Sequence, residues 1–317
     1  QPAQAPTQPV RFSAQWLSVV AHIDEYGGRV TTFDSAMAAE FPVVPFFGDS
    51  FTFGVGVADE QTYVSLLGSG SKIRFINLGV SGSCLANQLD VLEKRYQEIG
   101  SPKVCIFTFF VGNDFTDIYS AYHPPDVEHP PIANKMDALL VYFNDFIYNS
   151  AYLKKVYLIQ LLRAKLLFLL NRGAAQPRLN PIFRVINSKD PFLKEVDPFL
   201  DQTLDRLARL SKSLNFLPYF IIIPDTYQTA LPLLTKKAKY YGISMDQIDV
   251  SLPNRIVQEK FRRSHIPFAD TLPCMQANPE GSYYVQDNHL TAKGHQIVAE
   301  CVNGSLSLFL DIGSKKN

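Results

Sequence analysis

A serine that could act as a nucleophile follows a short apolar run near the start of the chain. The run at residues 43–47 ends at Gly48, and Asp49 and Ser50 come next. If the run is a strand that leads into a helix, Ser50 lies at the carboxyl end of the strand, where open α/β sheets bind their ligands. The positive end of the helix would favour negative charge developing beside it. Gly, Asp and Ser are also ordinary turn residues, so the tripeptide alone equally fits a turn.

A candidate base for this serine lies near the other end of the chain. Asp287 and His289 are two residues apart, shortly before Thr291, which we expect to cap a last helix. In an extended loop, residues i and i+2 point the same way, so Asp287 could orient the imidazole while its other nitrogen faces Ser50. A serine hydroxyl is a poor nucleophile until such a base accepts its proton. A capping aspartate beside a surface histidine would have the same sequence.

Two further strand ends offer hydrogen-bond donors for a developing negative charge. Gly82 follows the apolar run at residues 72–78, and its backbone N–H would not be screened by a side chain. Asn113 follows the run at residues 104–111 and carries a side-chain amide. A preorganised donor to an oxyanion is worth roughly 2.7–4 kcal/mol. Taken separately, each of these residues equally fits a turn at the end of a strand.

The elements that must position these residues alternate along the chain. Short apolar runs ended by Gly or Pro are typical of strands buried on both faces, and helical patterns lie between them. This alternation predicts a parallel α/β sheet with right-handed crossovers. The expected strands are residues 43–47, 72–78, 104–111 and 217–223, and the expected helices are residues 85–99, residues 197–214 with Pro198 at the first position, and a helix after Thr291.

We expect residues 1–40 to form an N-terminal arm and lead-in segment, and residues 41–317 to form one domain. Residues 1–10 are mostly Gln, Pro, Ala and Thr, which cannot build a core, so they are expected to be a loose arm. Residues 115–196 are too long for a simple connection and are expected to form a mainly helical insertion. Its aromatic residues could stack on sugars or pack between helices. Its most apolar stretch, residues 156–170, is too short and too charged to span a bilayer but could cover a cleft.

Composition excludes several classes of protein. The 317 residues are 46% apolar, enough for a large core, and their formal net charge is zero without a basic cluster, so no nucleic-acid partner is expected. No integral membrane segment is expected either. No CxxC motif occurs, and buried free thiols are slightly favoured over a disulfide. The chain begins with Gln1, and with its arm it fits an exported protein, periplasmic or secreted. The four cysteines are Cys84, Cys105, Cys274 and Cys301.

In this order and at strand ends, the motifs resemble the SGNH/GDSL hydrolase superfamily, and residues 48–67 resemble a bacterial branch of it particularly closely. The resemblance implies a flavodoxin-like three-layer α/β/α fold, no metal or other cofactor, and hydrolysis or transfer of acyl esters. It implies that Ser50 is the nucleophile and also an oxyanion donor through its N–H, with Gly82 and Asn113 completing the oxyanion hole. Asp287 and His289 would complete the triad.

Two features depart from the family pattern. The family more often has two residues between the aspartate and the histidine, whereas Asp287 and His289 have one between them, as in some branches. The insertion has no clear counterpart in compact members, so the substrate cannot be carried over. We expect a serine esterase that hydrolyses short-chain or acetyl esters of a small molecule or a glycan. The alternatives are an O-acyltransferase, a lipase or lysophospholipase, and a non-catalytic carbohydrate-binding module.

Overall fold

The structure is a computed structural model that describes residues 8–14, 17–32, 42–69, 71, 73–123, 179–285 and 287–314. Its contacts divide the chain into two compact units. One contains Gln1–Tyr122 with Asn180–Asn317, and the other is His123–Leu179. Almost all of the second unit lies outside the described residues, so the fold below is that of the first unit.

Five parallel strands form the central sheet of this unit. Their order is β4-β3-β5-β6-β7, which is the flavodoxin-like order 2-1-3-4-5 when the sheet strands are counted along the chain. The four strands expected from the sequence are confirmed within one or two residues at each end. The fifth has only three residues, too few to show a period. The strands are β3 (Val43–Gly48), β4 (Arg74–Gly79), β5 (Val104–Phe110), β6 (Leu217–Ile223) and β7 (Phe268–Asp270).

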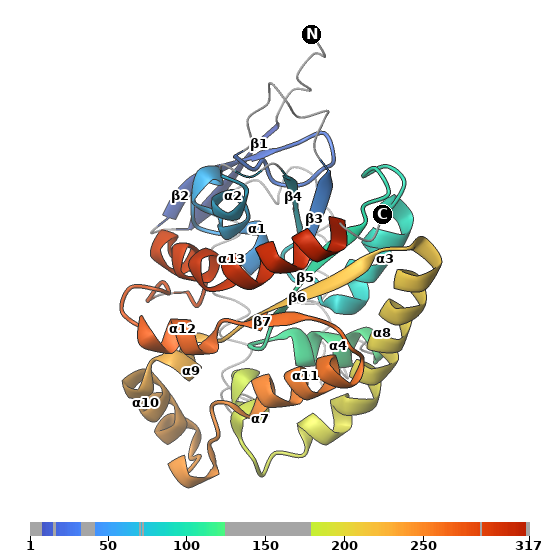
Figure 1. Cartoon of the computed structure of the whole chain (residues 1–317). Coiled ribbons are helices and arrows are strands. Elements are labelled where there is room, and N and C mark those ends of the chain that lie inside the picture. Colours follow the sequence, from blue (N-terminus) through green and yellow to red (C-terminus); the bar gives the residue numbers. More distant parts are fainter. Residues whose placement is uncertain are drawn as a thin grey trace, which may run out of the picture. The chain divides into compact units, whose positions relative to one another are not determined.

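Helices cover both faces of the sheet, so the predicted three-layer α/β/α fold is confirmed (Figure 1). On one face, Ile106 and Ile221 share a buried cluster with Val302. On the other, the Phe220 ring lies 4.2 Å from that of Phe261. The first face is covered by α2 (Tyr63–Gly68), α12 (Leu272–Ala277) and α13 (Ala292–Ser314), and the second by α3 (Leu85–Arg95), α4 (Asp114–Tyr122), α8 (Phe192–Leu214) and α11 (Leu252–Arg263).

Helix α8 begins earlier than the sequence predicts. The expected start was Asp197 with Pro198 at the first position, but Pro198 lies inside the helix. The chain has a second Asp-Pro pair seven residues before, and the Asp190 carboxylate accepts the N–H of Phe192 at 2.9 Å. That carboxylate satisfies a backbone donor that a helix start leaves without a partner, so the helix begins there.

Shorter elements complete the unit and lie mainly at the ends of strands. The first of them carries Ser50 and is a single turn. They are α1 (Ser50–Phe53), α7 (Ile182–Ile186), α9 (Thr226–Thr229), α10 (Leu231–Tyr241) and the 3₁₀ turns Asp59–Gln61 and Met245–Gln247.

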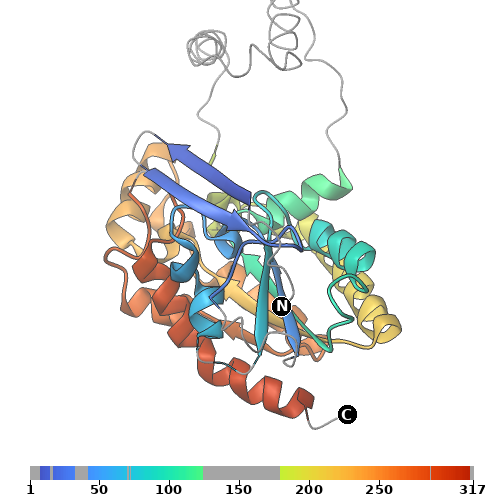
Figure 2. The ribbon, with the colours of Figure 1, turned by 90° about the horizontal axis from the view of Figure 1, so that it is seen from above.

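The N-terminal segment is a hairpin. Strands β1 (Gln8–Ala14) and β2 (Leu17–Ile23) pair antiparallel, side by side in Figure 2. The expectation of a loose arm is therefore wrong for residues 8–10, because backbone pairing with β2 orders them; residues 1–7 lie outside the described part. Beyond β2, Arg29 forms an isolated bridge with Asn77 of β4, so the lead-in segment reaches the edge of the central sheet.

The two ends of the predicted insertion belong to the first unit. Residues 115–122 lie in α4, residues 182–186 form α7 and residues 192–196 begin α8. The Tyr119 and Phe192 rings pack edge to face at 5.6 Å. The rest of the predicted insertion, including its most apolar stretch at residues 156–170, falls almost entirely outside the described residues. Within the described part of the chain, no helix is long and apolar enough to cross a membrane.

A disulfide joins Cys274 of α12 to Cys301 of α13. The preference for free thiols is therefore wrong for this pair, whereas Cys84 and Cys105 are buried and reduced. The pair could not be seen in the sequence because a separation of 27 residues does not reveal that the two helices pack together.

Reducing this disulfide should lower the stability of the fold. Its removal frees a loop of 27 residues in the unfolded chain, which should cost about 2–4 kcal/mol. Urea unfolding with and without reductant measures the loss. The double variant Cys274→Ser/Cys301→Ser should have the same stability as the reduced wild type, and the reductant should not change it. Equal unfolding midpoints for oxidised and reduced wild type would contradict the prediction.

Candidate active site

Ser50 is the first residue of α1, at the carboxyl end of β3. The Asp49 carboxylate caps this turn by accepting the N–H of Phe51 at 2.9 Å. The passage from strand to helix is tight: a Cβ on Gly48 would lie 1.9 Å from Oγ1 of Thr52. Glycine at that position therefore allows the chain to turn directly from the sheet into the helix that carries Ser50.

The structure brings His289 to Ser50 across 239 residues of sequence. The imidazole Nε2 lies 2.8 Å from the Ser50 hydroxyl, and Nδ1 is hydrogen-bonded to the Asp287 carboxylate. The imidazole ring centre also lies 5.1 Å from the ring of Phe51. With a carboxylate on one nitrogen and a hydroxyl on the other, the imidazole is held in the orientation that proton transfer from Ser50 requires.

The one-residue spacing between Asp287 and His289 works through a turn. The Asp287 carboxylate accepts the backbone N–H of His289 at 2.8 Å, and it is also hydrogen-bonded to Nδ1 of the His289 imidazole. Asp side chains commonly bend in this way toward the N–H two residues later. The expected extended loop is therefore wrong, because the carboxylate reaches the ring by curling back rather than by pointing in parallel with it.

Two tyrosines that the sequence did not single out anchor the histidine loop. The Tyr283 hydroxyl donates to the carbonyl of Pro224 beyond β6 at 2.6 Å, and the Tyr284 hydroxyl donates to the carbonyl of Gly56 at 2.7 Å. Thr291 accepts the N–H of Gly294 at 3.2 Å, which confirms it as the cap of α13. No pattern in the sequence distinguishes these tyrosines, because their partners are backbone carbonyls of distant segments.

Gly82 and Asn113 lie at the same rim of the sheet. Gly82 has φ +76°, and a Cβ there would meet no atom within 4 Å, so its backbone borders open space. Its loop is tied to the strand that leads to Ser50, since Val80 N–H and the Ser83 hydroxyl both donate to the carbonyl of Gly48 at 2.9 Å. Asn113 directly precedes α4, and its side-chain oxygen Oδ1 is buried and makes no hydrogen bond to any described residue.

Buried carboxylates surround the rim. Burial raises the pKa of Asp49 to about 7 and the pKa of Asp225, which caps α9, to about 7. Burial also raises the pKa of Asp114 well above its ordinary value, with the charge of Asp49 adding to the shift, and it raises that of Asp117 to about 6. Asp114 and Asp117 both lie in the first turn of α4.

His295 is a buried residue of α13. Its Nδ1 accepts the N–H of Tyr63 at 3.2 Å, and burial lowers its pKa to about 3. It is a neutral packing residue. No set of three His, Cys, Asp or Glu side chains among the described residues is placed to hold a metal ion. Residues 123–129 contain further histidine and carboxylate side chains, and of these only His123 lies within the described part of the chain.

No protein-family model and no curated protein matches the chain. Among solved structures it is similar to a protein of the G-D-S-L family from Desulfitobacterium hafniense DCB-2, at 15% identity and a TM-score of 0.40 over 82% of this chain and 97% of the other. It is also similar to a lipase from a goat rumen metagenome, at 12% identity and a TM-score of 0.47 over 83% of this chain and 97% of the other. A third neighbour is an acetyl xylan esterase from Geobacillus stearothermophilus, at 14% identity and a TM-score of 0.41 over 82% of this chain and 92% of the other.

Asp49→Asn should stabilise the fold at high pH. Because burial raises the pKa of Asp49 from 3.8 to about 7, the folded chain binds more protons than the unfolded chain between these values. Stability therefore falls as pH rises through that window. Asparagine keeps an oxygen for the Phe51 N–H without the charge. Between about pH 4.5 and about pH 8, the unfolding free energy of the variant should fall less than that of the wild type. The difference between the two losses should be at least the roughly 1.4 kcal/mol that one pKa unit represents.

Denaturant unfolding at both pH values measures the difference. The exposed Asp205 of α8 supplies the control variant, Asp205→Asn. An unchanged pH dependence in Asp49→Asn, or the same change in both variants, would contradict the prediction.

Proposed function

We propose that this chain is a serine ester hydrolase of the SGNH/GDSL type. The observation that carries the proposal is the hydrogen-bonded series from the Ser50 hydroxyl to His289 Nε2, at 2.8 Å, and from Nδ1 to Asp287. A nucleophile within hydrogen-bond reach of a base, which a third group orients, is the arrangement that activates serine for acyl transfer. The Gly-Asp-Ser, Gly, Asn and Asp-x-His motifs meet at one rim of the sheet, as expected for that family.

In the first half of the reaction, the Ser50 oxygen attacks the ester carbonyl carbon while His289 accepts the hydroxyl proton. The carbonyl π electrons move onto oxygen, and the tetrahedral oxyanion is stabilised by the N–H groups of Ser50 and Gly82 and by the amide of Asn113. The C–O bond of the leaving alcohol then breaks, and His289 donates its proton to that oxygen. An acyl-enzyme remains on Ser50.

In the second half, water attacks the acyl-enzyme while His289 accepts a proton from it. Ser50 leaves with that proton, and the carboxylic acid is released. If an acceptor hydroxyl replaces water, the same steps transfer the acyl group to another alcohol. Hydrolysis is the simpler function of these residues because it needs no second binding site, and transferase activity would be seen as an ester product when acceptor alcohols are present.

The acyl groups are proposed to be short, with acetyl esters of glycans as a candidate class. This part of the proposal draws on the disulfide between Cys274 and Cys301, since disulfides persist in oxidising compartments such as the periplasm or the cell exterior. We therefore also propose a periplasmic or secreted location.

Ser50→Ala should remove ester hydrolysis without unfolding the protein. Deleting the nucleophile of such a triad lowers kcat by roughly 10³-fold or more. Release of p-nitrophenol from p-nitrophenyl acetate measures the rate, and Ser213→Ala, at an exposed position of α8, serves as control. Mass spectrometry after treatment with an organofluorophosphonate should show one adduct, on Ser50. A wild type that neither reacts nor turns over, or a Ser50→Ala variant with full activity, would refute the proposal.

The length of the acyl chain is tested by a panel of p-nitrophenyl esters. The highest kcat/KM should fall on acetyl or propionyl esters, with acetylated oligosaccharides releasing acetate. The Ser50→Ala variant supplies the background at every chain length. A maximum on long-chain esters or on lysophospholipids would instead identify a lipase, although the nucleophile assignment would stand.

A further inference from the structure

Arg29 is a buried arginine that lies outside all the motifs described above. Its side chain is only 1% exposed. Its backbone N–H donates to the carbonyl of Asn77 on β4 at 2.8 Å, which fixes it beside the edge of the sheet. A buried charge is retained only where protein groups replace the lost water. The partners of this guanidinium therefore show what the arginine holds in place.

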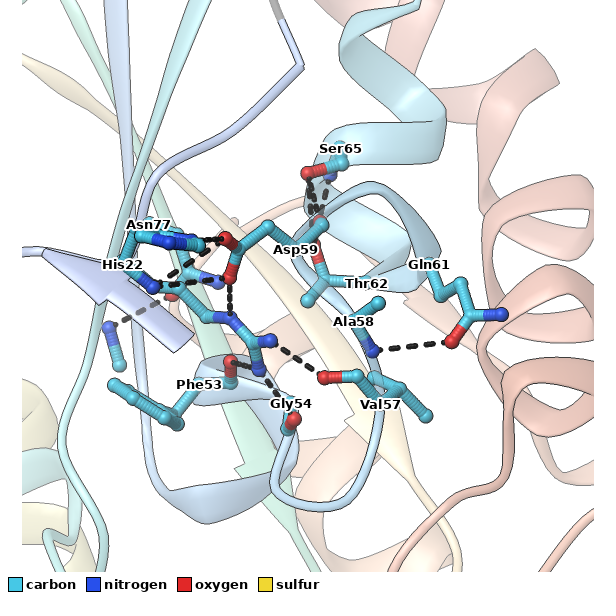
Figure 3. Close-up of polar contacts among 12 residues, drawn as sticks. His22, Phe53, Gly54, Val57, Ala58, Asp59, Gln61, Thr62, Ser65 and Asn77 are labelled. Atoms are coloured by element: carbon cyan, nitrogen blue, oxygen red, sulfur yellow. Dashed lines mark hydrogen bonds and ion pairs between the residues drawn. The ribbon is translucent and has the colours of Figure 1, made fainter. Parts of the chain in front are cut away.

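Three of those partners are carbonyl groups at the end of α1 and in the turn that follows it. One terminal nitrogen, Nη1, donates to the carbonyls of Phe53, at 3.0 Å, and of Gly54. The other, Nη2, donates to the carbonyl of Val57 at 2.5 Å. Figure 3 shows these three carbonyls together at one end of α1. The last carbonyls of a helix have no donor within the helix, so Arg29 supplies donors that the short helix lacks.

Asp59 fixes the direction of the guanidinium. It accepts from Nε of Arg29 at 2.7 Å, whereas the three carbonyls accept from the terminal nitrogens. It also accepts the backbone N–H of His22 at 3.3 Å (Figure 3). The His22 ring nitrogen lies 2.6 Å from the same carboxylate. A carboxylate on Nε leaves both terminal nitrogens directed at the turn.

The turn at residues 54–57 is connected to both partners of the reaction. The carbonyl of Ser50 accepts the N–H groups of Gly54 at 3.0 Å and Val55 at 3.1 Å. The carbonyl of Gly56 accepts the hydroxyl of Tyr284, which lies in the loop of His289. A shift of this turn would therefore move the nucleophile and its base relative to each other.

We propose that Arg29 is a positioning residue that sets the distance between Ser50 and His289 by holding the turn at residues 54–57. The inference rests on the proposed function, because it concerns the reactivity of Ser50. Arg29 does not contact the triad residues itself. Its loss should therefore slow acylation of Ser50 and leave substrate binding unchanged.

The test compares Arg29→Lys and Arg29→Met with the wild type. Lysine keeps the charge but has one compact ammonium group in place of a planar fork, so it cannot reach all three carbonyls and Asp59 together. For p-nitrophenyl acetate, kcat of Arg29→Met should fall roughly 10- to 100-fold, the cost of a small misplacement of reacting groups, with KM unchanged. The kcat of Arg29→Lys should lie between those of the wild type and Arg29→Met. The rate of organofluorophosphonate labelling at Ser50 should fall in the same order, from wild type to Arg29→Lys to Arg29→Met.

Two controls separate positioning from a general loss of stability. Arg74→Met removes an arginine that pairs with Glu25 of the same N-terminal segment at 3.1 Å but has no contact with the turn. Val302→Ala weakens the core on α13. Both should keep the wild-type kcat per folded molecule, with the folded fraction taken from thermal unfolding. If the Arg29 variants do not fold, Asp59→Ala releases the guanidinium from its orienting carboxylate and should lower kcat in the same way.

The outcomes are distinct. A wild type that turns over and labels, with Arg29 and Asp59 variants that match it per folded molecule, would overturn the positioning role alone. The same fall in kcat in Val302→Ala as in Arg29→Met would also overturn it, because general destabilisation would then explain both. A wild type without turnover or labelling would overturn the proposed function and the inference that rests on it.

Discussion

The arrangement at the rim depends on keeping a single helical turn in place. Helix α1 has four residues, and a helix this short has no stability of its own in water. Its position therefore comes from its neighbours. The side chain of Asn77 donates to the carbonyl of Thr52 at 2.7 Å. The Thr52 hydroxyl is hydrogen-bonded to the hydroxyl of Tyr63, which is in turn hydrogen-bonded to the hydroxyl of Thr108 on β5. The helix also lies close against β4, since a Cβ on Gly79 would come within 2.3 Å of the Phe53 nitrogen.

Several groups at this rim are buried at a cost to stability. Asp49 and Asp114 each have one carboxylate oxygen that is buried and makes no hydrogen bond to a described residue. Buried polar groups of this kind destabilise a fold unless they are paired. The rest of the unit offsets the cost through apolar contacts on both faces of the sheet and through the disulfide that holds α12 to α13. The apolar packing of the sheet and the disulfide therefore stabilise a unit whose rim contains destabilising buried carboxylates.

Much of the frame could be predicted from the sequence, because its signals are local. The runs that became β3 to β6 are mostly apolar, since both faces of the sheet are covered. Features that depend on distant partners could not be predicted in this way. The hairpin of β1 and β2 has no clear period, β7 is too short to show one, and Asp190 and Asp197 precede proline equally well although only the first begins α8. The choice between such equal local signals was made by packing.

The same distinction between local signals and distant partners applies to the candidate site. By itself, the sequence determined the residue types: a serine after a buried strand, donors after the next two strands, and an acid with an imidazole before a capped helix. Only the tertiary structure decided their distances, including the 2.8 Å between Ser50 and His289, the turn that lets Asp287 reach the imidazole, and the place of Arg29 behind α1. The physical reason is range. Apolar periodicity and capping act over a few residues, whereas a hydrogen bond between segments 239 residues apart exists only after the sheet has brought them together.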